Sequence, residues 1–227
     1  MRHPLAVLAV LLPLALLGEC CRWLGRDPLQ PEPYLLGDPL LGHLGLLVGL
    51  GRPWMAPVML TLWGVIVLTL GRVGWKRPAI STLVLIVLWG GLWGIARCIL
   101  GFSCHTLLPD QLFAQAGLLL SGAIQEELLF RGFILGLFIL IGRGLGASFL
   151  VSALVSLPLS AVFFSLAHTD IVNHHLGAEI FSWPAFCERG LAGLLYGFVF
   201  LRYGLATSTM AHLAYLLALQ AGLGRWL

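Results

Sequence analysis

The chain has 227 residues, of which 59% are hydrophobic and only 10% are charged, and its formal net charge is +3. A soluble domain carries about 25% charged residues, so this composition excludes a soluble surface and predicts an all-α, polytopic transmembrane helical bundle. The basic residues are scattered between apolar runs, which argues against a nucleic-acid partner and leaves the lipid bilayer as the expected surroundings.

Apolar runs of spanning length recur along the chain. The first, roughly residues 4–24, resembles a signal peptide, but no small-residue cleavage site follows it and we expect an uncleaved helix. A shorter run over 35–51 is interrupted by polar residues and Pro39, so it spans the bilayer, re-enters it or lies at its surface. The remaining expected spans are 54–71, 80–100, 112–141, 147–167, 186–201 and 205–223, which makes seven or eight hydrophobic segments.

Two further patterns bear on packing and on cofactors. Small residues spaced by four, Gly132/Gly136 and Gly193/Gly197, predict close approach of neighbouring helices. The five cysteines show no metal or redox spacing, and we expect neither a metal nor another cofactor.

The stretch QEELLFRGF, residues 125–133, holds three ionisable side chains inside a strongly apolar region. Each charge at the bilayer centre costs about 2.5–3.5 kcal/mol, so three of them require an explanation. Glu127 and Arg131 are four residues apart on one helix face and are predicted to form an ion pair. Glu126 lies about 100° away around the helix and is left over, as a candidate general base.

Two histidines lie on other apolar helices. His168 ends the run FFSLAH, and His212 lies inside STMAHLAY. A leftover carboxylate and two intramembrane histidines on three helices favour one shared site. There, Glu126 and His168 would hold and deprotonate a water molecule, and His212 would donate to the oxyanion formed at an amide carbonyl.

These motifs resemble a known family. Glu-Glu-x-x-x-Arg at 126–131, Phe-x-x-x-His at 164–168 and the later His212 are similar to the CAAX-protease and bacteriocin-processing family (CPBP, or Abi) of intramembrane glutamic endopeptidases. The resemblance covers about residues 112–216. It implies a catalytic helical core over 111–227 and says nothing of the first hundred residues. We expect an accessory N-terminal transmembrane region over 1–110.

The resemblance also implies a role for each matching residue. Glu126 would be the catalytic carboxylate and His168 its partner on the water. Glu127 and Arg131 would support them, and Phe164 would pack beside the site. His212 would belong to the oxyanion hole.

The family pattern is broken at one position. Four residues after the last histidine the family usually has Asn, and this chain has Leu216, which donates no hydrogen bond. Asn173 and Tyr215 are the candidate substitutes for the missing oxyanion donor.

The expected activity is hydrolysis of a peptide bond in a membrane-associated protein or peptide, such as C-terminal processing or removal of a sorting tail. Lys76 is the only lysine among 13 basic residues, a bias that indicates a GC-rich bacterium and hence its inner membrane. The sequence does not indicate an oligomeric state.

Alternative interpretations stay open. The polar cluster is also consistent with a non-catalytic membrane scaffold or binding protein. Leu216 favours this interpretation, because it stands where the family usually has Asn. A zinc-dependent protease would use the loop 168–179, which offers His168, His174, His175 and Glu179 but lacks a His-Glu-x-x-His motif. Glu188 and Arg189, near a helix start, are predicted to be an interfacial anchor or a local pair.

Overall fold

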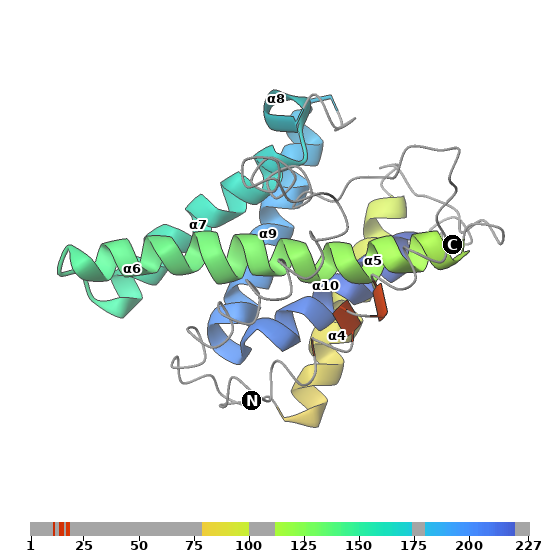
Figure 1. Cartoon of the computed structure of the whole chain (residues 1–227), viewed down its shortest axis with the longest axis horizontal. Helices are drawn as coiled ribbons and strands as arrows, with labels where there is room; N and C mark the ends of the chain where they lie inside the picture. The colour runs from red at the N-terminus through yellow and green to blue at the C-terminus, as the bar shows by residue number, and fades with distance from the viewer. Residues whose placement is uncertain are drawn as a thin grey trace, which may run out of the picture.

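The regular elements of the protein are helical throughout the residues that the structure describes, with no strand among them (Figure 1). The structure is a computed structural model and describes residues 11, 14, 15, 17, 18, 79–99, 112–173 and 180–220. Its elements in chain order are α4 (Ile80–Ile99), α5 (Leu112–Glu127), η3 (Leu128–Leu135), α6 (Gly136–Gly144), α7 (Phe149–Ala167), α8 (Asp170–Asn173), α9 (Trp183–Tyr203) and α10 (Leu205–Gln220).

The longest feature is a continuous rod formed by α5, η3 and α6, drawn in green in Figure 1. It corresponds to the apolar run predicted over 112–141 and extends it to Gly144. The central segment η3 is a π-helix. Such stretches are rare and are frequent at functional sites. This one begins directly after the two adjacent glutamates.

Helix α7 folds back along the rod after a short turn at Gly146, whose φ of 87° suits glycine. Ser148 caps the helix by accepting a hydrogen bond from the amide of Val151 at 3.3 Å. The hydroxyl of Ser160 donates to the carbonyl of Phe130 in η3 at 2.7 Å, joining α7 to the π-helical segment. The contact of Ser160 therefore brings α7 and η3 close together.

Helix α9 packs against α7 through the predicted glycine pair. A Cβ added at Gly193 would lie 3.0 Å from the Cα of Ala161, so the close approach expected from the spacing Gly193/Gly197 is confirmed. The chain then turns at Gly204 into α10.

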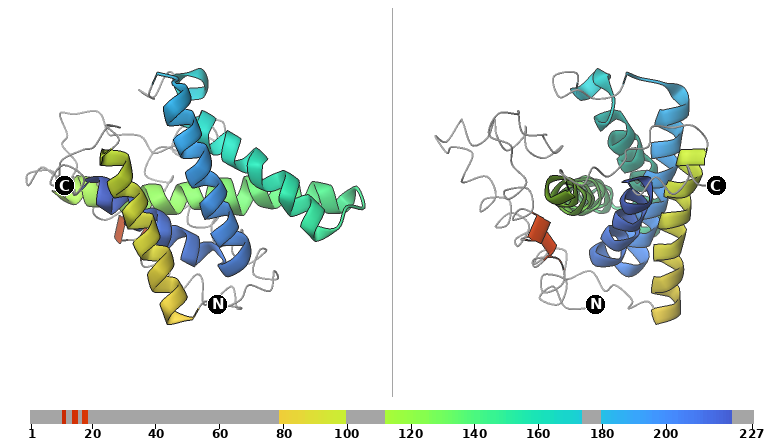
Figure 2. Two further views of the ribbon diagram at one scale, coloured as in Figure 1. Left: turned by 180° about the vertical axis from the view of Figure 1, so that it is seen from behind. Right: turned by 90° about the vertical axis from the view of Figure 1, so that its right-hand side faces the viewer.

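Helix α4 lies along α10 on the side away from the rod, as the end-on view of Figure 2 shows. A Cβ at Gly94 would meet the carbonyl oxygen of Tyr215 at 2.5 Å, so only glycine permits this contact. The two helices touch backbone to backbone.

Two of the described helices are long and apolar enough to cross a bilayer, namely Phe149–Ala167 and Trp183–Tyr203. Shorter apolar helices cover Ile80–Ala96 and Leu205–Leu219. The all-helical prediction is confirmed within the described residues, whereas the count of seven or eight segments is not, because 35–51 and 54–71 and most of 4–24 lie outside them.

Candidate active site

The two adjacent glutamates lie at the junction of α5 and η3 and meet different surroundings. The side chain of Glu127 is fully buried, and that of Glu126 is 16% exposed. Consecutive residues of a helix point about 100° apart, so the two carboxylates have different neighbours. The different exposure of the two side chains therefore agrees with the prediction that Glu127 is paired and Glu126 is left over.

Glu127 is held by three side chains from two helices. Its Oε1 lies 3.3 Å from Nη1 of Arg131, which confirms the predicted i,i+4 ion pair. The same oxygen accepts a hydrogen bond from Nδ1 of His212 at 3.0 Å, and Oε2 accepts one from the hydroxyl of Ser208. A buried carboxylate needs this degree of pairing to be tolerated.

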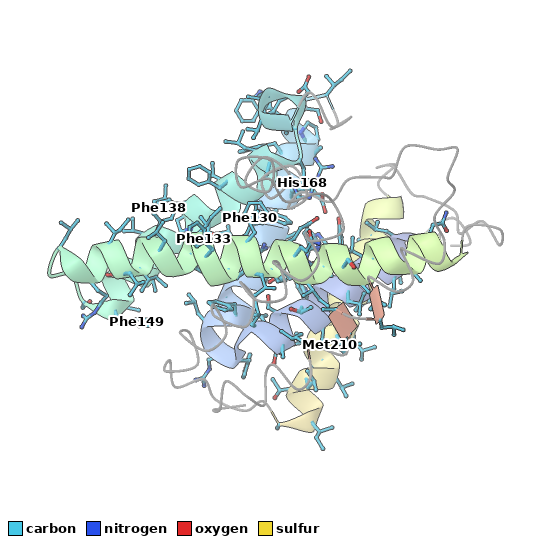
Figure 3. All side chains as sticks on the ribbon, in the orientation of Figure 1. Phe130, Phe133, Phe138, Phe149, His168 and Met210 are labelled. Carbon is cyan, nitrogen blue, oxygen red and sulfur yellow. The ribbon has the colours of Figure 1, made fainter. Side chains whose placement is uncertain are left out.

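The guanidinium of Arg131 lies between aromatic rings. Its Cζ is 4.3 Å from the ring centroid of Phe164 and 5.5 Å from that of Tyr196. Aromatic faces attract a cation and cover it from solvent, so these rings stabilise the charge together with Glu127. Phe164 thus lies beside the cluster, in T-shaped contact with Phe130 at 5.1 Å and with His168 at 4.8 Å. Figure 3 labels Phe130 and His168 among the side chains.

Glu126 lies between the two histidines. Its Oε2 is 3.5 Å from Nε2 of His168 and 3.7 Å from Nε2 of His212. Both distances exceed the 2.7–3.2 Å of a direct hydrogen bond and are short enough for one water molecule to join the groups. The sequence motifs on α5, α7 and α10 therefore converge on one carboxylate oxygen.

The tautomer of His168 follows from its contact with its own helix. Its Nδ1 lies 2.8 Å from the carbonyl oxygen of Phe164, which only accepts, so Nδ1 carries the proton. In the neutral ring Nε2 is then an acceptor and faces a carboxylate that also accepts. A water molecule has two O–H donors and satisfies both at once.

The same reasoning applies to His212. Its Nδ1 donates to the carboxylate of Glu127, so Nε2 donates a hydrogen bond only when the ring is an imidazolium. The arrangement matches a carboxylate that orients a histidine and stabilises its charged form. His212 is only 3% exposed, so its orientation is set by protein contacts and not by solvent.

The proposed substitutes for the missing donor have different outcomes. The hydroxyl of Tyr215 donates to Oε1 of Glu188 at 3.1 Å, so it is engaged away from Glu126. Asn173 ends α8, and its side chain lies outside the described residues. Leu216 packs against the buried cluster that contains Tyr196 and Tyr215.

The zinc alternative depends on residues that the structure does not describe. His174, His175 and Glu179 of the predicted ligand set all lie outside the described ranges. Within 79–99, 112–173 and 180–220, no three His, Cys, Asp or Glu side chains are arranged to hold a metal ion together.

The prediction that Glu188 and Arg189 form an interfacial anchor was wrong, whereas the alternative of a local pair stays a prediction. Both residues are buried, and Oε1 of Glu188 accepts hydrogen bonds from Nε1 of Trp93 and from Tyr215, each at 3.1 Å. These donors come from α4 and α10, so Glu188 joins three helices. Helix α9 buries the face that carries Glu188 against the neighbouring helices. The prediction considered only that Glu188 lies near the start of its helix.

Sequence reasoning also missed two residues of the site. Ser208 lies four residues before His212 and thus on the same face of α10, a spacing that could have indicated it. Tyr196 stacks on the imidazole of His212 with ring centroids 4.8 Å apart. Nothing in the α9 sequence separates Tyr196 from an ordinary core aromatic.

The geometry agrees with a comparison against protein families. Residues 108–218 match the model for type II CAAX prenyl endopeptidase Rce1-like proteins. This match places the segment 108–218, about half of the chain, in the CPBP family. The resemblance drawn from the three motifs is thereby confirmed. No curated protein and no solved structure matches the chain.

CPBP proteins of this type are integral membrane proteases that act on membrane-associated protein substrates. The matched residues include α5, η3, α6, α7, α8, α9 and all but the end of α10. The CPBP segment therefore contains every residue of the cluster around Glu126.

Proposed function

We propose that the chain is an intramembrane peptidase of the glutamic type, with Glu126 as general base and His168 as its partner on the attacking water. The observation that carries this proposal is the position of the Glu126 carboxylate, whose Oε2 lies 3.5 Å and 3.7 Å from the two Nε2 atoms. A general base must reach the proton it removes directly or through one water, and these distances allow it.

The proposed reaction begins with a water molecule that donates one hydrogen bond to Glu126 and one to Nε2 of His168. Its oxygen attacks the carbonyl carbon of the scissile peptide bond while one proton passes to Glu126. The carbonyl π bond becomes an oxyanion. When the C–N bond breaks, Glu126 returns the proton to the leaving amine, and a carboxylic acid and an amine result.

His212 is proposed to stabilise the oxyanion through its Nε2–H. This role requires the imidazolium, and Glu127 on Nδ1 supports that form. Two carboxylates, Glu126 and Glu127, then face two cations, Arg131 and His212, so the buried cluster has no net charge. Neutrality matters because an uncompensated charge in a low-dielectric interior is costly.

The domain organisation belongs to the same proposal. Residues 111–227 would form the catalytic core and 1–110 an accessory transmembrane region. Helix α4 of that region packs on α10, and its Trp93 donates to Glu188 of α9. The accessory region would therefore support the helix that carries His212.

The proposed substrate is a membrane-associated protein or peptide that undergoes C-terminal processing or loses a sorting tail in a bacterial inner membrane. Family membership supports a membrane-associated protein as substrate. A non-catalytic scaffold is the second candidate, and Leu216 favours it because the expected oxyanion donor is absent from that position.

One experiment separates the two candidates. Membranes of the native host lacking the gene would receive wild type or Glu126→Gln at matched levels, and new protein termini would be mapped by mass spectrometry. We expect termini that appear with wild type only, and a rate on the corresponding synthetic peptide about 10²–10⁴-fold lower for the variant.

Phe133→Leu is the matched control, because this ring in the adjoining turn is 52% exposed. It should cleave like wild type. Identical termini with wild type and Glu126→Gln would sink the peptidase proposal and favour the scaffold.

A further inference from the structure

Among the rings that the structure describes, Tyr196 alone stacks on the imidazole of His212. Its side chain is fully buried, and its ring lies 4.8 Å from the imidazole at an interplanar angle of 17°, so the two rings are stacked. Phe164 and Tyr215 approach the same imidazole at 77° and 51° with centroids 6.0 Å and 6.2 Å away. Tyr196 comes from α9 and His212 from α10, so the stack crosses between helices.

The backbone of Tyr196 is joined to the same group. The hydroxyl of Ser208 lies 3.0 Å from the carbonyl oxygen of Tyr196 and also contacts Glu127, so the single hydroxyl proton is shared between these two acceptors. Glu127 in turn accepts from Nδ1 of His212. One residue of α9 therefore supports the pair formed by Glu127 and His212 from two directions.

The stack supplies a constraint that the hydrogen bond does not. The bond at Nδ1 fixes one atom of the imidazole, and the ring plane can still tilt about it. A ring packed flat on the imidazole removes that freedom, so Nε2 keeps facing Glu126 at 3.7 Å. An aromatic face also favours a cation, and the imidazolium is the form that donates from Nε2.

We propose that Tyr196 is the positioning residue of His212, whose ring holds the imidazole in the plane required for oxyanion stabilisation. This inference rests on the proposed function, because it concerns how His212 acts in that reaction. The role belongs to the ring: among the described residues, no group lies within hydrogen-bond distance of the Tyr196 hydroxyl. Removing a buried hydroxyl without a partner should be close to neutral.

The kinetic test compares Tyr196→Phe, which keeps the ring, with Tyr196→Leu, which removes it. The substrate is the synthetic peptide that spans a Glu126-dependent cleavage site. We expect kcat of Tyr196→Leu to fall about 10–10²-fold with KM within about twofold, since a misplaced catalytic group lowers the rate by this order. Tyr196→Phe should stay within about threefold of wild type.

The matched control is Phe200→Leu, which removes a buried ring one turn later on α9, in the other core cluster. It should lose thermal stability comparable to Tyr196→Leu and keep the wild-type kcat. The proposal is overturned if Tyr196→Leu retains kcat, if Tyr196→Phe loses as much as Tyr196→Leu, or if Phe200→Leu loses kcat equally.

A second measurement needs no substrate. The measurement is the NMR spectrum of the detergent-solubilised protein labelled at histidine, in which the His212 ring protons are assigned by comparison with His212→Gln. The stacked ring of Tyr196 should shift these resonances upfield. The shift should persist in Tyr196→Phe and disappear in Tyr196→Leu. Unchanged resonances in Tyr196→Leu contradict the inference.

The two proposals fail in different ways. If Glu126→Gln cleaves like wild type, the peptidase proposal fails, and the His212 resonances still decide whether Tyr196 orients the imidazole. If Glu126→Gln is inactive and Tyr196→Leu is fully active, only the positioning role fails.

Discussion

Glu126 and Glu127 are neighbours in the chain, yet they belong to two different regions of the molecule. The region around Glu127 is closed: the carboxylate is fully buried and contacts Arg131, Ser208 and His212. The region around Glu126 is partly open, with 16% of this side chain and 23% of His168 exposed. Its contacts with the histidines are longer than hydrogen bonds.

The difference shows how one helix turn can serve stability and chemistry separately. A group already bound at short distance to several partners is poorly suited to accept a proton from substrate water. A carboxylate with longer contacts and partial exposure is accessible to a reactant. Substitutions on the Glu127 side should therefore affect folding most, and those on the Glu126 side should affect the rate.

The largest effect is expected for Arg131→Met. It leaves Glu127 buried without its guanidinium, a change that costs about 3–5 kcal/mol and should strongly lower the yield of folded protein. Thermal denaturation of the protein in detergent measures this loss of stability. The double variant Arg131→Met with Glu127→Gln should recover part of the stability, because the uncompensated charge is removed. A single variant as stable as wild type would refute the structural role of this pair.

The next effect is expected for His168→Gln, on the open side. The ring is 23% exposed, and its Nδ1 donates to the carbonyl of Phe164 in its own helix, so stability should change by less than about 1 kcal/mol. The cleavage rate should fall about 10²-fold or more. Phe163→Leu, on an exposed part of the same helix, is the control and should cleave normally. Wild-type turnover by His168→Gln would show that the open side does not carry the chemistry.

A smaller effect is expected for Ser208→Ala, on the closed side. The variant removes one hydrogen bond to Glu127 and should lower stability by about 1–3 kcal/mol. Since His212 keeps its own bond to Glu127, kcat should fall only several-fold. Thr209→Val, which removes a buried hydroxyl bonded to Leu205 in its own helix, provides the comparison and should leave kcat unchanged. If Ser208→Ala lowered the cleavage rate more than His168→Gln does, the closed side and not the open side would carry the chemistry.

Much of the site could be predicted from local spacing. The ion pair of Glu127 with Arg131 follows from a separation of four residues, and the leftover Glu126 follows from the angle between consecutive helix positions. The close packing at Gly193 follows from the repeat of small residues. These inferences succeed because one helix fixes the relative directions of its own side chains.

Contacts between helices could not be predicted from the spacing of residues within one helix. The burial of Glu188 between Trp93 and Tyr215 depends on which faces of α4, α9 and α10 meet, whereas the sequence predicted an interfacial anchor or a local pair. The engagement of the Tyr215 hydroxyl with Glu188 has the same origin. Propensity and period describe one helix at a time and do not specify its partners.

By itself, the sequence determined that the chain is helical and apolar, that one carboxylate is left without a local partner, and that its motifs are those of the CPBP family. Only the tertiary structure decided that Tyr196 stacks on His212, that Ser208 contacts Glu127 and that Glu126 lies between two imidazoles. The physical reason is that backbone geometry relates residues three or four positions apart in one helix, whereas packing brings together side chains from different helices.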